Sequence, residues 1–220
     1  MILGLLIVIK NIHTIMFIHL PIEIWQCILN SLDFKSQIIM RMVCKLFYEK
    51  LEIWDFNNIS FIYTEKFTDT ILLAYPFIRY LYAARNQMIT NVNHLTNLQI
   101  LRAWGTSCGI SDNGIKNIDL IFLDVDDNPK ITNVNHLTNL QKLWAGGTDC
   151  GIDDNGIKNL NLIELHADNN PKITNVNHLT NLQKLWATGY CGIDDTGIKD
   201  LKNLIELHAN YNPKITKKID

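Results

Sequence analysis

Three histidines spaced 42 residues apart, His94, His136 and His178, are the first candidates for chemistry, because imidazole is a common metal ligand. Each lies in a copy of the string ITNVNHLTNLQ, which begins at Ile89, Ile131 and Ile173. A repeat of this length predicts stacked coils, two in each 42-residue period, with strands about 4.8 Å apart. The histidines are then about 10 Å apart, whereas zinc holds its ligand atoms at about 2 Å. We therefore expect no shared metal site.

The sequence offers little else for catalysis. DVDDN at Asp124 resembles the start of a calcium loop, but Pro129 replaces the required glycine and Asn135 replaces the closing glutamate. The sequence contains no phosphate-binding glycine loop, no HExxH and no nucleophile elbow. A net charge of −2 argues against nucleic acid as the partner. We expect a protein that is not an enzyme and that binds no cofactor or metal.

The elements that position these residues follow from a pattern of leucines. The pattern LxxLxAxxN places its second leucine at spacings that alternate between 20 and 22 residues: Leu81, Leu101, Leu123, Leu143, Leu165, Leu185 and Leu207. A small apolar residue follows two positions later, which indicates a short strand with one face inward. A lone coil buries too little apolar surface to offset the entropy of ordering it, so the coils must stack. The strands are predicted to stack in parallel.

The residue after each of these leucines is predicted to point outward and to form a central row on the concave face. That row holds Tyr82, Arg102, Asp124, Trp144, His166, Trp186 and His208. We interpret Arg102, Asp124, Trp144, His166, Trp186 and His208 as candidate target-binding residues, since aromatic side chains on a rigid sheet favour protein contacts. Duplication of the repeat without selection for binding is the alternative. The next row, Lys142, Glu164, Lys184 and Glu206, is predicted to be a solvated charge ladder.

These coils resemble leucine-rich repeats over residues 77–216. The segments LTNLQKLWAGGT and LNLIELHADNNPKIT carry the resemblance, which implies an α/β solenoid with a parallel β-sheet on its concave face. Short outer helices are expected at DNGIKNL and DTGIKDL. The family's asparagine ladder is matched only in alternate coils, at Asn86, Asn128, Asn170 and Asn212. An irregular extra coil with a helix near residues 68–75 is expected before Leu81, and the last coil, ending in ITKKID, has no recognisable cap.

The front of the chain has a different pattern. Residues 20–51 contain apolar helical stretches, with Ile24, Ile28 and Leu32 on one face and Pro21 suited to a first helical turn. This segment resembles an F-box, a three-helix module that docks on the Skp adaptor of cullin-based ubiquitin ligases. The DFKSQI segment departs from the pattern of the family. The resemblance implies these Skp-binding residues: Leu20, Pro21, Glu23, Ile24, Ile28, Leu29, Leu32, Val43, Lys45 and Phe47. Packing inside the module is the alternative role for the apolar members.

Cysteine use indicates a reducing compartment. The five cysteines form no CxxC pair, and Cys108, Cys150 and Cys191 occupy matching repeat positions, so we read these three as small buried residues. The opening run MILGLLIVI is too short to span a bilayer and no positive segment precedes it. Translation from Met1, and translation from Met16 with residues 1–15 as an upstream or minor extension, are the two alternatives. We expect no membrane association and no secretion.

Together these patterns predict an extension over residues 1–15, an F-box over 16–56, a linker or irregular first repeat over 57–76, and about seven coils over 77–220. The resemblance implies an F-box/leucine-rich-repeat adaptor that brings an unknown target protein to a ligase. The near-identical repeats, rich in Asn and Ile, resemble those of giant DNA viruses, in which case Skp and cullin belong to a host cell and the protein works in its cytoplasm or nucleus. A decoy that only sequesters Skp, and a binding or structural repeat protein unrelated to ubiquitin, are the alternatives.

Overall fold

The computed structural model describes residues 21–56 and 66–216, and it divides the chain into two compact units, Met1–Ile53 and Trp54–Asp220. The expectations for residues 1–15, for Met16 and for Leu20 lie outside the described residues. Among the described residues, no helix has the length and apolar character needed to cross a bilayer.

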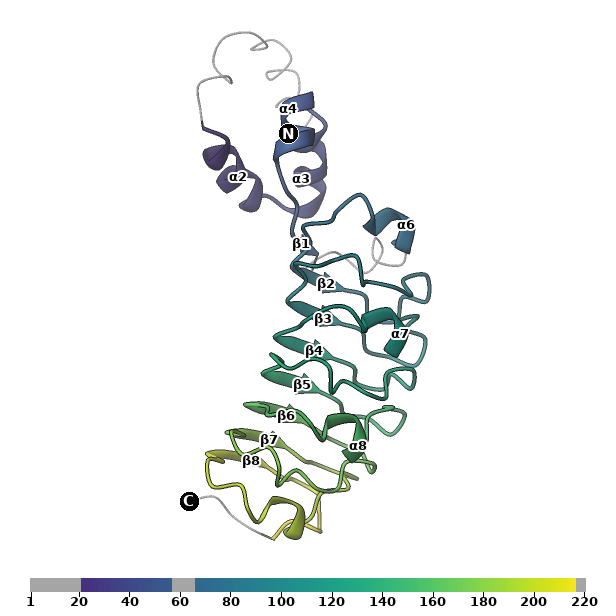
Figure 1. Ribbon diagram of the computed structural model, residues 1–220, viewed down its shortest axis with the longest axis vertical. Coiled ribbons are helices and arrows are strands. Elements are labelled where there is room, and N and C mark those ends of the chain that lie inside the picture. Colours follow the sequence, from purple (N-terminus) through teal and green to yellow (C-terminus); the bar gives the residue numbers. More distant parts are fainter. Residues whose placement is uncertain (1–20, 57–65, 217–220) are drawn as a thin grey trace. The chain divides into compact units, whose positions relative to one another are not determined.

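The first unit consists of helices α2 (Ile22–Asn30), α3 (Phe34–Arg41) and α4 (Lys45–Lys50) in its described part (Figure 1). Pro21 has extended backbone angles immediately before α2, where its missing N–H costs nothing. Asp33 starts α3, because its carboxylate accepts hydrogen bonds from the Ser36 N–H at 3.0 Å and the Ser36 hydroxyl at 2.9 Å. The DFKS segment, which departs from the family pattern, therefore still defines the beginning of the second helix.

A small apolar core holds this unit together. Trp25 and Leu29 from α2 and Phe47 from α4 are buried, and the Trp25 and Phe47 rings lie 4.9 Å apart. Gln26 adds a polar link, because its side-chain amide donates to the Glu52 carbonyl and accepts from the Glu52 N–H, both at 2.8 Å. Three short helices are thus joined by a few large side chains and one paired amide.

The second unit contains one parallel sheet of eight strands in its described part, in the order β1 to β8 along the chain (Figure 1). The strands are β1 (Asp55–Phe56), β2 (Tyr80–Tyr82), β3 (Ile100–Arg102), β4 (Phe122–Asp124), β5 (Lys142–Trp144), β6 (Glu164–His166), β7 (Lys184–Trp186) and β8 (Glu206–His208). From β2 to β8 each leucine pairs with the next, beginning with Leu81 and Leu101. The predicted leucine spine is confirmed, and β1 adds the strand of an earlier coil.

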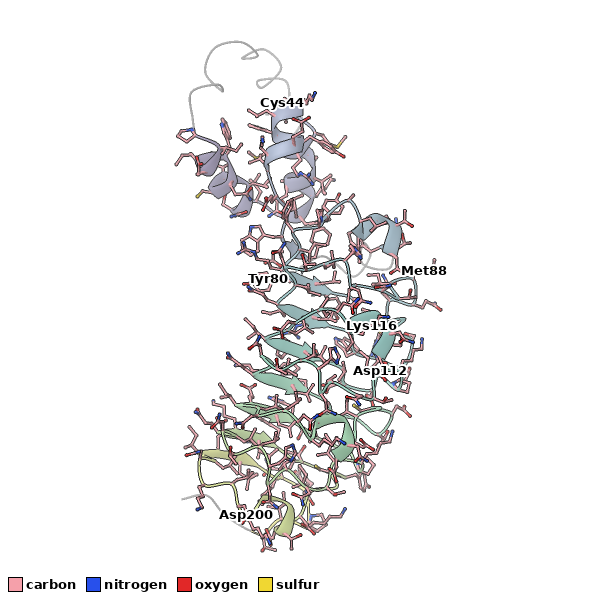
Figure 2. The ribbon with its side chains drawn as sticks, in the orientation of Figure 1. Cys44, Tyr80, Met88, Asp112, Lys116 and Asp200 are labelled. Carbon is pink, nitrogen blue, oxygen red and sulfur yellow. The ribbon has the colours of Figure 1, made fainter. Side chains whose placement is uncertain are left out.

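Short helical turns lie on the side of the coils opposite the strands: α6 (Asp69–Leu72), α7 (Asp112–Ile115), α8 (Asp154–Ile157) and the 3₁₀ turn η1 (Thr196–Ile198) (Figure 1). Asp112, at the start of α7, is labelled in Figure 2. Each is a single turn, shorter than the seven-residue segments expected from the sequence. An aspartate at each turn fastens the next coil: the Asp154 carboxylate accepts from the Thr174 N–H at 2.7 Å and from its hydroxyl at 2.6 Å. Asp69, Asp112 and Asp195 bind Thr90, Thr132 and Thr216 in the same way.

The asparagine ladder is confirmed in every second coil. The Asn170 amide nitrogen donates to the Ala145 carbonyl at 2.7 Å and the Ile152 carbonyl at 3.1 Å, and its oxygen accepts from the Lys172 N–H at 2.9 Å. Cys108, Cys150 and Cys191 are buried in the other coils, as predicted. Burial raises the pKa of the Cys150 thiol to about 12, so this sulfur stays protonated and unreactive at neutral pH.

Candidate functional site

A stack of rings runs across the open face of the sheet, the face opposite the leucine spine. We define the aromatic stripe as Trp144, His166, Trp186 and His208, which pair directly in register from β5 to β8. Neighbouring ring centroids lie 4.8, 3.9 and 4.8 Å apart in that order, and the last two pairs are nearly parallel, at 12° and 15°. The strand spacing of about 4.8 Å produces this stacking. The predicted neighbours on this face are therefore confirmed, and they offer ring edges to a partner because neighbouring rings cover the faces.

Charged side chains hold the imidazoles in place. The Glu164 carboxylate is hydrogen-bonded to Nε2 of His166 at 3.1 Å and forms an ion pair with Lys142 at 2.9 Å. Glu206 repeats the arrangement with His208 at 2.8 Å and Lys184 at 2.6 Å. Burial acts to raise the pKa of Glu164, but the bonds to Lys142 and His166 outweigh burial and hold this pKa below its usual value. The predicted charge ladder thus exists as pairs, and it orients the stripe.

Arg102 and Asp124 lie beside the stripe but differ in accessibility. The Arg102 guanidinium lies over the Phe122 and Trp144 rings, 5.4 and 5.2 Å from their centroids, and 3.6 Å from the Asp124 carboxylate. Asp124 was expected on the surface, but only 2% of it is exposed. Asp124 pairs in register with Arg102 on β3 and Trp144 on β5, and the Arg102 guanidinium contacts its carboxylate, so it supports Arg102 instead of offering a carboxylate to a target.

Burial of Asp124 has a consequence for stability that depends on pH. Burial, followed by the charge of Asp126, raises the pKa of Asp124 to about 7. The folded state then holds a proton that the unfolded chain releases near pH 4. This proton stabilises the fold at low pH, and its contribution is lost as the pH rises through 7.

The variant Asp124→Asn should remove this dependence, because an amide keeps the shape and cannot ionise. At pH 8 we expect the variant to be more stable than the parent by about 2–4 kcal/mol, following from about three pKa units at 1.36 kcal/mol each. At pH 5 the two proteins should differ much less. Urea unfolding at both pH values measures this, and parallel pH profiles for parent and variant would contradict it.

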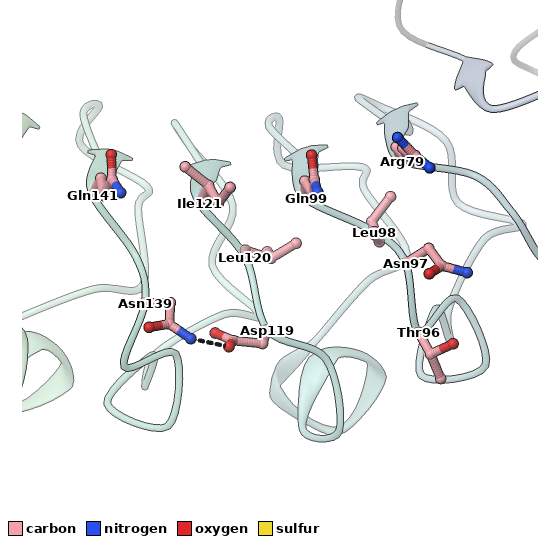
Figure 3. Close-up of a pocket in the computed structure, with 10 residues that line it drawn as sticks. All are labelled: Arg79, Thr96, Asn97, Leu98, Gln99, Asp119, Leu120, Ile121, Asn139 and Gln141. Carbon is pink, nitrogen blue, oxygen red and sulfur yellow. Dashed lines mark hydrogen bonds between the residues drawn. The ribbon is translucent and has the colours of Figure 1, made fainter.

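A hollow lies along the edge where the strands begin. It has a volume of about 610 Å³ and is lined by Arg79, Thr96, Asn97, Leu98, Gln99, Asp119, Leu120, Ile121, Asn139 and Gln141 (Figure 3). The Asn139 amide donates to the Asp119 carboxylate across neighbouring coils (Figure 3). Amide and apolar side chains make up most of this lining.

The implied Skp-binding residues divide between surface and interior. Pro21, Glu23, Ile24, Ile28 and Lys45 are exposed, and Leu32 and Val43 are half-buried. Leu29 is 0% and Phe47 is 4% exposed, so these two side chains form the core of the unit and present no surface to a partner. Sequence reasoning missed Met42, Leu46 and Tyr48, which are large and exposed on the same unit.

Two of the repeated histidines form hydrogen bonds between neighbouring coils. His136 and His178 each bond a carbonyl of the preceding coil through Nε2, Ile115 at 2.9 Å and Ile157 at 3.0 Å. Across residues 21–56 and 66–216, no group of three or more His, Cys, Asp or Glu side chains is arranged to hold a metal ion.

Comparison with known proteins assigns the front of the chain to a family. Residues 17–58 match the F-box domain. Among solved structures, an internalin from Listeria monocytogenes is similar over 69% of this chain with 22% sequence identity and a TM-score of 0.49; the chain spans 46% of that internalin. A search of curated proteins found no match. The front of the chain thus carries an F-box domain, and the leucine spine and asparagine ladder described above form a solenoid of the leucine-rich-repeat type.

Proposed function

We propose that the protein is a substrate-recognition adaptor of a Skp–cullin–F-box ubiquitin ligase. In this role the F-box binds the Skp adaptor, Skp connects to the cullin, and the open face of the sheet binds a target protein. The observation that carries the proposal is the exposed pair Ile24 and Ile28 on an F-box helix, 45% and 38% accessible. Exposed apolar residues on so small a module are suited to an interface.

The adaptor would carry out no bond chemistry of its own. Its contribution would be proximity, since joining a target and a ligase through one chain raises their effective concentration. Buried, unpaired cysteines fit work in a reducing compartment, the cytoplasm or nucleus. If the chain is viral, as its near-identical repeats suggest, Skp and cullin are host proteins.

Replacing Trp144 and Trp186 by alanine should abolish target capture while leaving Skp binding intact. Both rings belong to the stripe, and their removal leaves the imidazoles without stacking partners. We expect at least a tenfold loss of captured target from a cell lysate, measured by quantitative mass spectrometry, with unchanged recovery of Skp.

The matched control is Trp104→Ala/Tyr190→Ala, which removes two aromatic rings outside the stripe and should keep both partners. Equal target capture by the stripe variant and the control would contradict target binding at the stripe. Skp binding without turnover of any captured protein would indicate a decoy. Absence of Skp binding by the parent would remove the adaptor function altogether.

A further inference from the structure

A row of acidic side chains borders the aromatic stripe on the open face. Asp124, Trp144 and His166 are paired in register on β4, β5 and β6, and two positions further along each coil the chain reaches Asp126, Gly146 and Asp168. Gly146 has no side chain, so the two carboxylates are neighbours across one coil, on strands about 10 Å apart. Both aspartates are half-buried, which fixes them more firmly than free surface side chains.

The next coil holds each carboxylate by one oxygen. Asp126 Oδ1 accepts from the Gly146 N–H at 2.6 Å, and Asp168 Oδ1 accepts from the Thr188 N–H at 2.9 Å and from its hydroxyl at 2.5 Å. Every one of these bonds uses Oδ1, which leaves Oδ2 of each residue as an acceptor for an incoming group. The carboxylates are thus oriented in advance, which lowers the entropic cost of binding.

The negative charge of this row is not neutralised by the protein. Within the described part of the chain, no Lys, Arg or His nitrogen lies within 4.0 Å of either carboxylate. The nearby cations are already paired: Lys142 with Glu164, Lys184 with Glu206, and Arg102 with Asp124. Burial is the main cause that raises the pKa of Asp126; the Gly146 N–H bond and the charge of His166 act against it, and the charges of Asp127 and Asp168 add to it.

The stripe supplies the apolar half of a composite surface. His166 lies two residues before Asp168, about 7 Å along the strand direction. Trp144 is at the same level on β5, the strand next to the one that leads to Asp126. The methylene stem of a lysine or arginine spans a similar length, and such stems pack on apolar surfaces while their charged heads reach outward. A basic side chain can therefore lie across a ring edge and end at an Asp oxygen.

We propose that the open face binds a basic target segment, with arginine or lysine side chains lying across the aromatic stripe and ending at Asp126 and Asp168. The inference rests on the proposed target-binding function and adds the chemistry of the target. Two basic residues in positions i and i+3 of a polyproline II segment lie about 9.3 Å apart on the same side, which matches the two carboxylates.

The test uses the purified full chain and a labelled twelve-residue peptide with arginine at every third position among prolines. We expect the variant Asp126→Asn/Asp168→Asn to weaken peptide binding at least tenfold in fluorescence anisotropy, because asparagine keeps the Oδ1 acceptor and removes the charge. The control Asp119→Asn/Asp200→Asn changes the net charge equally at two exposed positions away from the stripe, and should alter binding less than twofold. The same peptide with citrulline in place of arginine should bind at least tenfold more weakly.

Three outcomes would overturn the inference: no binding of the arginine peptide, equal weakening by both aspartate variants, or equal binding of the citrulline peptide. Skp binding by the same proteins keeps the two proposals apart. If the parent binds Skp but any of these three outcomes occurs, only the inference of a basic target segment is rejected. If the parent does not bind Skp, the adaptor function is rejected.

Discussion

Glutamate at both Ile24 and Ile28 should reduce binding of the Skp adaptor at least 100-fold. The two side chains are one turn apart on α2 and already exposed, so glutamates there remain hydrated in the free protein and cost little folding free energy. In an interface each carboxylate would be buried without a partner, at several kcal/mol, and a 100-fold loss requires only about 2.7 kcal/mol. Isothermal titration of purified Skp adaptor into each protein measures the change.

The control for this prediction is the same substitution at exposed isoleucines of the second unit, Ile121→Glu/Ile205→Glu. These side chains are 40% and 67% accessible, and their replacement should leave Skp affinity unchanged. A variant at Ile24 and Ile28 that keeps its helical circular dichroism and still binds Skp within threefold of the parent would show that this face of α2 is not the interface.

The sequence predicted the sheet register because the coils are copies of one another. Once Leu143 and Leu165 are known to occupy equivalent positions, their direct pairing follows, and so does the pairing of Trp144 with His166. A period of two along each strand then decides which side chains face the leucine spine and which face outward. Repetition therefore determined both the fold and the membership of the stripe.

Periodicity could not predict how deeply an outward residue is covered. Asp124 is in the outward row, yet it is buried, and its register neighbours Arg102 and Trp144 are not copies of one residue. The F-box presents the same difficulty on a smaller scale. Ile24, Ile28, Leu29 and Phe47 all match the family pattern. Only packing in the folded module shows that the first two are exposed and the last two are buried.

Local chemistry could have revealed two further features. Asp33 three residues before Ser36 is a helix-start signal that the sequence displays directly, and the structure uses it. The aspartate that fastens each outer turn to a threonine of the next coil is separated from it by 20 or 21 residues, as in Asp154 and Thr174. Such a pair is recognisable only after the coil length is known.

The variant Asn170→Ala should lower the free energy of unfolding by about 3–5 kcal/mol. Asn170 is fully buried, and its loss leaves the Ala145 and Ile152 carbonyls and the Lys172 N–H without their side-chain partner. Each buried polar group left unpaired costs about 1–3 kcal/mol. Because coils are stable only through their neighbours, this local loss should weaken the stack on both sides. Urea denaturation followed by circular dichroism measures it.

The matched control is Asn139→Ala, an exposed asparagine on the edge of a coil whose amide bonds the Asp119 carboxylate. A single exposed bond of this kind contributes little, so the control should stay within about 0.5 kcal/mol of the parent. A loss below about 1 kcal/mol for Asn170→Ala would mean that water satisfies the freed carbonyls. The coils would then be held by the leucine spine and the aspartate–threonine bonds, with the asparagine ladder serving only to shape the turn.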